Sequence, residues 1–188
     1  VLDVKIGSGA FFPEPDRARL LAETMVGIGE ANGVRTRALL TRMDTVLGHA
    51  AGNGLEVAES VETLRGDGPA DLVEVTIALA REMLELVGID TDPAPVLASG
   101  DAYSVWEAMV AAQGGDPGAP LPVAPHREVV AAPASGVLQR LDARAVGIAA
   151  WRLGAGRARK EDPVSATAGI VCLAKPGDAV RAGEPMLE

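Results

Sequence analysis

The chain has 188 residues, a formal net charge of −9 and 48% hydrophobic residues, although only 3% of its residues are aromatic. Together with a mean hydropathy of +0.19, this composition predicts a folded core and excludes a disordered protein. The negative charge argues against a nucleic-acid surface but still permits a local site for a phosphate-containing ligand. No segment reaches the ~20 apolar residues of a membrane span, and no signal-peptide pattern is present. We therefore expect a cytoplasmic protein with neither nucleic acid nor membrane as partner.

Residues 1–41 predict a strand–helix–strand unit. A β-rich run at 1–6 leads into the glycine turn Gly7-Ser-Gly9, and Pro13-Glu-Pro-Asp16 favours the start of a helix. Leu20, Leu21, Met25 and Ile28 then recur at helical spacing until Asn32-Gly33, and residues 34–41 read as the next strand. This connection predicts that the two strands are parallel neighbours.

The chain opens inside a strand and closes at the start of another, since no turn or cap precedes Val1 and residues 183–188 begin a further β-rich run. Both ends predict that the sequence is a piece of a larger α/β protein.

The middle of the chain predicts helices. A glycine-containing loop over residues 44–53 precedes expected helices at 55–64, 70–87 and 102–112, and Gly88 supplies the end of the second. Residues 115–126 are rich in Pro and Gly, as is typical of a linker between domains. We therefore expect a partial α/β domain over residues 1–114 and a C-terminal domain over residues 127–188.

The C-terminal domain predicts short strands around one helix. Strands are expected at 128–132, 136–141 and 168–174, a helix at 143–153 follows the capping residue Asp142, and Lys175-Pro-Gly-Asp178 fits a type II turn. The single cysteine, Cys172, lies in an apolar run, which predicts a buried, inert thiol. The predicted fold is α/β: a truncated mixed or parallel sheet with flanking helices, then a small α+β domain.

The residues by themselves give weak chemical signals. The loop Gly7-Ser-Gly9 could cradle an anion with its N–H groups, but it lacks the remaining residues of a dinucleotide loop or P-loop, so a structural turn is favoured. Neither His49 nor His126 has a second ligand nearby for a transition metal, and Glu56 and Glu59 read as solvent-facing helix residues. The basic residues of 152–160 indicate a solvated loop, with domain docking or an anion contact as the alternative.

Several segments, in one order along nearly the whole chain, resemble the C-terminal half of the pyrimidine-nucleoside phosphorylase or thymidine phosphorylase family. They are Leu2–Phe11, Gly33–Thr36, Ala38–Thr41, Leu47-Gly48, Ala51–Asn53, Leu55–Val57, Met109–Gln113, Asp142–Ala145, Leu153–Arg157, Glu161–Pro163 and Lys175–Asp178.

The resemblance implies a pentosyltransferase that cleaves a pyrimidine nucleoside with phosphate as co-substrate. The main catalytic residues of such enzymes would lie before Val1, so no catalytic residue is assigned here. The resemblance places Phe11 beside the 5-position of the base. It also makes the carbonyls of Leu47 and Ala50 and the carboxylate of Glu59 ligands of a structural K⁺, which prefers oxygen donors. The implied partners are the missing N-terminal portion and a second copy in a homodimer.

The C-terminal residues also resemble a biotinyl or lipoyl carrier module. Residues 130–136 and 177–183 match the strand–turn signals of that barrel-sandwich domain. The helix expected at 143–153 and the lack of a modifiable lysine tip argue against a carrier. The same architecture is implied for the C-terminal domain of the phosphorylases, so an α/β domain fused to a carrier stays open as the alternative.

Overall fold

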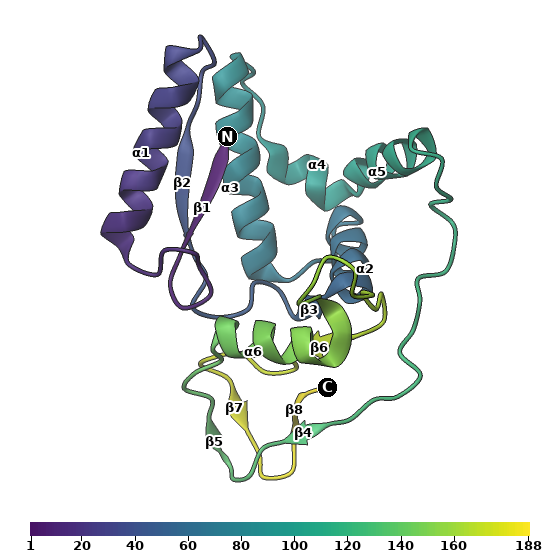
Figure 1. The fold of residues 1–188 in the computed structure, drawn as a ribbon. Coiled ribbons are helices and arrows are strands. Elements are labelled where there is room, and N and C mark those ends of the chain that lie inside the picture. Colours follow the sequence, from purple (N-terminus) through teal and green to yellow (C-terminus); the bar gives the residue numbers. More distant parts are fainter.

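A computed structural model describes all residues, 1–188. Its N-terminal part holds the parallel pair β1 (Leu2–Ile6) and β2 (Ala38–Arg42), joined by helix α1 (Pro15–Ala31) (Figure 1). Leu2 lies opposite Ala38, and Ile6 lies opposite Arg42. The prediction of parallel neighbours is confirmed, although the second strand begins at residue 38 and not at 34.

Helix α1 packs on these strands through small residues. Ala18 and Ala22 are buried beside Val4, because side chains of this size let the helix backbone approach the sheet closely. The apolar residues noted in the sequence contribute only in part, since Leu21 packs against this cluster whereas Leu20 and Ile28 are more than half exposed. The helix therefore covers β1 and β2 with one face and leaves apolar side chains uncovered on another.

The central part is helical. Its helices are α2 (Asn53–Leu64), α3 (Ala70–Val87), α4 (Pro93–Ser99) and α5 (Asp101–Ala112). Helix α3 has the predicted bounds and ends at Gly88, whose φ of 73° is left-handed. Helix α4 was not predicted. It forms because the Asp92 side chain accepts the N–H of Ala94 and Pro93 stands in the first turn, where no N–H partner is needed.

The C-terminal part contains short antiparallel strands around one helix. Its elements are β4 (Val130–Ala131), β5 (Gly136–Val137), α6 (Ala143–Ala150), the π-helical turn η1 (Trp151–Ala155), β6 (Gly169–Val171), β7 (Ala179–Val180) and β8 (Pro185–Leu187). Strand β4 pairs with β8, and β5 pairs with β7. The strands are shorter than predicted. The helix expected at 143–153 is α-helical only to residue 150 and continues as the π-helical turn η1. The fold class is therefore α/β, a helical part with a small parallel sheet followed by a small antiparallel part.

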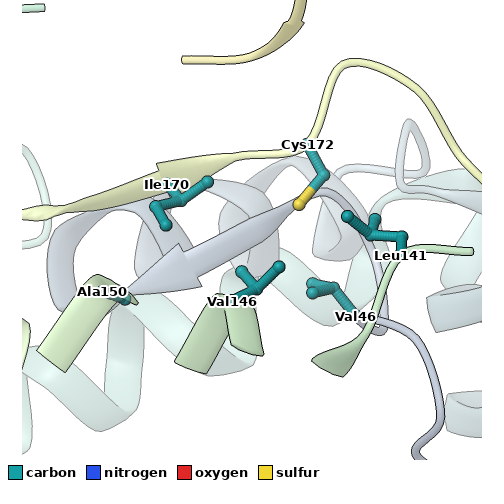
Figure 2. Close-up of a cluster of buried hydrophobic side chains, with 6 residues drawn as sticks. All are labelled: Val46, Leu141, Val146, Ala150, Ile170 and Cys172. Carbon is teal, nitrogen blue, oxygen red and sulfur yellow. The ribbon is translucent and has the colours of Figure 1, made fainter. Parts of the chain in front are cut away.

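One core joins the two parts of the chain. Strand β3 (Ala50–Gly52), which was not predicted, pairs antiparallel with β6. Beneath this pair, six buried side chains converge from both parts (Figure 2): Val46, Leu141, Val146, Ala150, Ile170 and Cys172. Cys172 is completely buried, as predicted. Residues 44–52 are therefore held in place by the C-terminal part.

Residues 113–129, between α5 and β4, form neither helix nor strand and run as a long connection on the right of Figure 1. The predicted linker at 115–126 falls within this connection, and the division into two domains stays a prediction.

A large part of the chain is uncovered. Only 16 of 188 residues are buried, and the accessible surface is 11,991 Å². A compact monomer of 19.2 kDa has about 8,400 Å² of accessible surface. Exposed apolar side chains on α1, α3 and α5 contribute to the excess, among them Leu20, Ile28, Met83, Val87, Val105 and Met109. No helix combines the length and the apolar character needed to cross a lipid bilayer.

Candidate functional site

The glycine loop after β1 is a closed structural turn. Gly7 N–H donates to the carbonyl of Pro13, Gly9 N–H to that of Met43, and Ala10 N–H to that of Gly7. The remaining N–H, from Ser8, donates to the Asp44 carboxylate at 3.1 Å. An anion would have to displace these acceptors and would meet the negative charge of Asp44. The structural interpretation of this loop therefore holds in this structure.

Phe11 lies directly after this loop and is fully exposed. Its neighbour Phe12 is half-buried beside β1 and β2, and the Arg17 guanidinium lies 4.8 Å from the centre of the Phe12 ring. Phe12 thus anchors the segment, while the Phe11 ring has no packing partner of its own.

Glu59 projects from α2 toward the loop that contains Leu47 and Ala50. Its Oε1 atom accepts the N–H of His49 at 2.6 Å. A Cβ at Gly48 would overlap the Glu59 carboxylate, and Gly48 has a left-handed φ of 66°. Glycine is therefore required there both for the backbone conformation and for the close approach of Glu59. The structure therefore places Glu59 against this loop, whereas Phe11 belongs to the separate segment after β1.

The two loop carbonyls singled out in the sequence are free of partners within the chain. Leu47 lies outside the strands, and its carbonyl accepts no hydrogen bond. Ala50 stands opposite Val171, and the flanking Cys172 N–H donates to the His49 carbonyl. Ala50–Val171 is therefore a non-hydrogen-bonded pair of the ladder, in which the Ala50 carbonyl points away from β6.

A cavity of about 420 Å³ lies beside this loop. Ala50 and Glu59 line it together with His49, Glu62 and Asp67. No group of three or more His, Cys, Asp or Glu side chains is placed to hold a metal ion. Glu59 thus places a carboxylate against a loop whose Leu47 and Ala50 carbonyls are free of partners within the chain, and oxygen atoms of these kinds are the ligands that a hard cation prefers.

Glu56, the other acidic residue noted on this helix, has a structural role. Its Oε1 atom accepts the N–H of Gly52 at 2.8 Å, at the N-terminus of α2. A carboxylate there satisfies an otherwise free donor and is stabilised by the helix dipole. The interpretation of Glu56 as a solvent-facing residue therefore missed its hydrogen bond to the start of α2.

The structure adds two residues that the sequence did not indicate, Lys175 and Asp71. The Lys175 ammonium donates to the Val46 carbonyl at 2.6 Å and to Asp71 Oδ2 at 2.9 Å. Partial burial opposes ionisation of Asp71, but the hydrogen bond and charge of Lys175 outweigh it, so the pKa of Asp71 is lowered. The N–H groups of Leu72 and Gly48 act in the same direction. No spacing signal could have revealed this pair, because 104 residues separate its members.

The four basic residues of segment 152–160 are exposed. The side chain of Arg157 donates to the carbonyl of Lys160, and the N–H groups of Ala158 and Arg159 donate to Asp162. These local bonds order the loop and agree with its interpretation as a solvated segment.

Two family models match the chain in order. Residues 1–103 match the a/b domain of a glycosyl transferase family, and residues 137–188 match the pyrimidine nucleoside phosphorylase C-terminal domain. The chain thus combines an α/β domain of a glycosyl transferase family with the C-terminal domain of a phosphorylase family. The chain belongs to the pyrimidine nucleoside phosphorylase and thymidine phosphorylase family.

Individual relatives agree with this assignment. The chain is 55% identical over 187 residues to a thymidine phosphorylase of Mycobacterium tuberculosis, covering 99% of this chain and 44% of the relative. It is 42% identical over 202 residues to a thymidine phosphorylase of Burkholderia cenocepacia, covering 99% of this chain and 46% of the relative. It is 40% identical over 199 residues to a pyrimidine-nucleoside phosphorylase of Bacillus subtilis, covering all of this chain and 46% of the relative. The chain thus spans less than half the length of these relatives.

Proposed function

We propose that this chain is part of an enzyme that catalyses reversible phosphorolysis of pyrimidine nucleosides, giving the free base and (deoxy)ribose 1-phosphate. The observation that carries this proposal is the 55% identity to a thymidine phosphorylase across 99% of the chain. The ordered matches to both family models support it, because they cover residues 1–103 and 137–188. Phosphate is then the co-substrate. Because the relatives include both thymidine phosphorylases and a pyrimidine-nucleoside phosphorylase, we propose thymidine together with other pyrimidine nucleosides as substrates.

The uncovered surface supports a larger assembly. The accessible area exceeds that of a compact monomer by about 40%. The two-stranded sheet β1–β2 leaves both outer edges unpaired, whereas proteins normally pair or cover the edges of a sheet. In the proposed enzyme, further polypeptide of the same protein covers these edges and the apolar faces of α1 and α3. The same enzyme works as a homodimer in the cytoplasm.

In this proposal, the C-terminal part is a barrel-sandwich domain of the biotinyl or lipoyl type used as a scaffold. The pairs β4–β8 and β5–β7 and the turn at Lys175–Asp178 are compatible with such a domain. The carrier alternative lacks support, since residues 137–188 match a phosphorylase domain.

The proposed mechanism is mainly electrostatic. Phosphate attacks the anomeric carbon of the sugar while the bond to the base breaks, and charge gathers on the departing pyrimidine. The groups that hold phosphate and base are supplied from outside this chain. Phe11 contributes a wall of the base pocket, for which its fully exposed ring is available.

A structural monovalent cation, with K⁺ as the candidate, completes the proposal. The residues fit such an ion, because Glu59 offers a carboxylate and Leu47 and Ala50 offer carbonyls that are free of partners within the chain. When bound, the ion supplies positive charge that holds the loop at residues 47–50 together with α2. Further oxygen donors would come from outside this chain.

The proposed activity is tested on the natural full-length protein. Thymidine and inorganic phosphate should give thymine and deoxyribose 1-phosphate, and omission of phosphate should abolish base release. Base release without phosphate, or no reaction with thymidine, uridine or deoxyuridine, would contradict the proposal.

The cation site is tested separately by Glu59→Gln. This variant should lose stimulation by K⁺, whereas Glu74→Gln, which removes the same charge from an exposed position of α3, should retain it. Unchanged potassium dependence in Glu59→Gln would refute the assignment of Glu59.

A further inference from the structure

Lys175 and Asp71 connect three distant segments at the loop that precedes β3. Lys175 belongs to the turn after β6, Asp71 to the first turn of α3, and Val46 and Gly48 to the loop itself. The Lys175 side chain is 19% exposed, less than any other cation that forms a salt bridge in the structure. The ammonium group is therefore largely shielded from solvent, while its partner Asp71 is 43% exposed.

The contacts fix the backbone on both sides of Leu47. The Val46 carbonyl accepts from Lys175, and the Gly48 N–H donates to Asp71 Oδ2 at 3.3 Å. The Gly48 N–H and the Leu47 carbonyl belong to the same planar trans peptide and point in opposite directions. Asp71 therefore orients the Leu47 carbonyl away from itself, and one residue later Glu59 holds the His49 N–H.

The turn that carries Lys175 is itself rigid. Asp178 accepts the N–H of Lys175 through its side chain at 2.7 Å, and its own N–H donates to the Lys175 carbonyl at 3.0 Å. Gly177 has a φ of 101°, as this turn requires. Lys175 thus projects from a fixed backbone position, and Asp71 neutralises its charge beside the loop.

We infer that Lys175 and Asp71 are positioning residues that set the orientation of the Leu47–Gly48 peptide, so that the C-terminal part of the chain controls the affinity of the cation site. This inference rests on the proposed cation site. Neither residue binds the cation itself. Lys175 holds Asp71 and the Val46 carbonyl, Asp71 orients the peptide, and the peptide presents the Leu47 carbonyl.

The test uses the natural full-length protein and its Lys175→Met variant. KCl is titrated at constant ionic strength against tetramethylammonium chloride, with phosphorolysis as one readout and the K⁺-induced rise in melting temperature as the other. We expect the K⁺ concentration for half-saturation to rise about tenfold, as for other residues that orient metal ligands. At saturating K⁺, kcat and the KM for phosphate should stay close to those of the unmodified protein.

Three further variants make the result decisive. Lys160→Met removes an exposed lysine from the same part of the chain and should leave the half-saturation concentration unchanged. Asp71→Asn can still accept from Gly48 and should shift the K⁺ titration less than Asp71→Ala does. Lys175→Arg should restore part of the affinity, and it replaces Lys175→Met if that variant does not fold.

Two outcomes would overturn the inference. If Lys175→Met lowers stability equally in both salts and leaves the K⁺ half-saturation unchanged, the pair is only a structural link. If the unmodified protein shows phosphorolysis without any response to K⁺, the cation site and this inference both fail while the proposed activity stands.

Discussion

The imidazole of His49 donates from Nδ1 to the carbonyl of Cys172 at 3.0 Å, and the Cys172 N–H donates to the His49 carbonyl at 2.7 Å. These two bonds extend the pairing of β3 and β6 by one residue on each strand. Because a carbonyl can only accept, Nδ1 carries the proton of the side-chain bond. The loop of the proposed cation site and the buried cysteine strand therefore form one unit.

Cys172 should be unreactive in the folded protein. Burial is the main cause of the raised pKa of its thiol, and the charge of Glu59 adds to it, while that of Lys175 opposes it. At pH 8 we expect reaction with a thiol reagent to be at least about a hundredfold slower than in the unfolded chain, because it requires local opening. Rapid labelling in the absence of denaturant would show that β6 is accessible.

Asp71 should make stability depend on pH in the acidic range. Its folded-state pKa is lowered, so ionised Asp71 contributes stability that is fully present above its unfolded-state pKa of about 3.9. This contribution is lost as the pH falls through the lowered folded-state pKa. We expect Asp71→Asn to reduce the loss of stability on acidification below about pH 4, measured as urea midpoints between pH 3 and 7.

The matched control is Asp90→Asn, at an exposed aspartate without side-chain hydrogen bonds. It should have the same acid sensitivity as the unmodified protein. An acid sensitivity of Asp71→Asn equal to that of the control would show that the ion pair with Lys175 does not form in solution.

Most of the helices and the parallel pair could be predicted because their signals are local, although α4 was missed. The bounds of α3 follow from apolar periodicity and from Gly88, and the β1–β2 pairing follows from the connection through α1. Strand β3 could not be predicted, because Ala50-Ala-Gly52 has little intrinsic preference for a strand and becomes one only by pairing with β6, more than 100 residues later.

The candidate site likewise has residues that could be named from the sequence and residues that only the folded structure brings together. Glu59 and the loop carbonyls came from resemblance to a family and not from spacing, and the structure places Glu59 against His49, between Leu47 and Ala50 in the chain. The contact of Lys175 with this loop could not be predicted from the sequence, since tertiary packing alone brings the turn at 175–178 against residues 46–48. Helical spacing did not show which face of α1 packs on the sheet, because hydrophobicity ranks Leu20 and Ile28 above Ala18, whereas close helix–strand contact favours the small residue.

Gly48→Ala should destabilise the loop for two reasons that a control can separate. The left-handed backbone alone makes alanine unfavourable by about 1–2 kcal/mol. The added Cβ would also overlap the Glu59 carboxylate. Gly33→Ala is the control, because Gly33 has a similar φ of 73° and open space around its Cβ position. Urea unfolding should show a larger loss for Gly48→Ala, and equal losses would mean that Glu59 does not pack against Gly48.

Ala18→Leu tests the close packing of α1 on β1. Ala18 has no exposed surface and lies in a small cluster with Val4 and Ala22, so a leucine there would push the helix away from the strands. We expect a loss of about 1–3 kcal/mol in the free energy of unfolding, as for other overpacked cores. Glu23→Leu, on the exposed side of the same helix, should change it by less than about 0.5 kcal/mol. If both variants were equally stable, α1 would not rest on the sheet through its alanines.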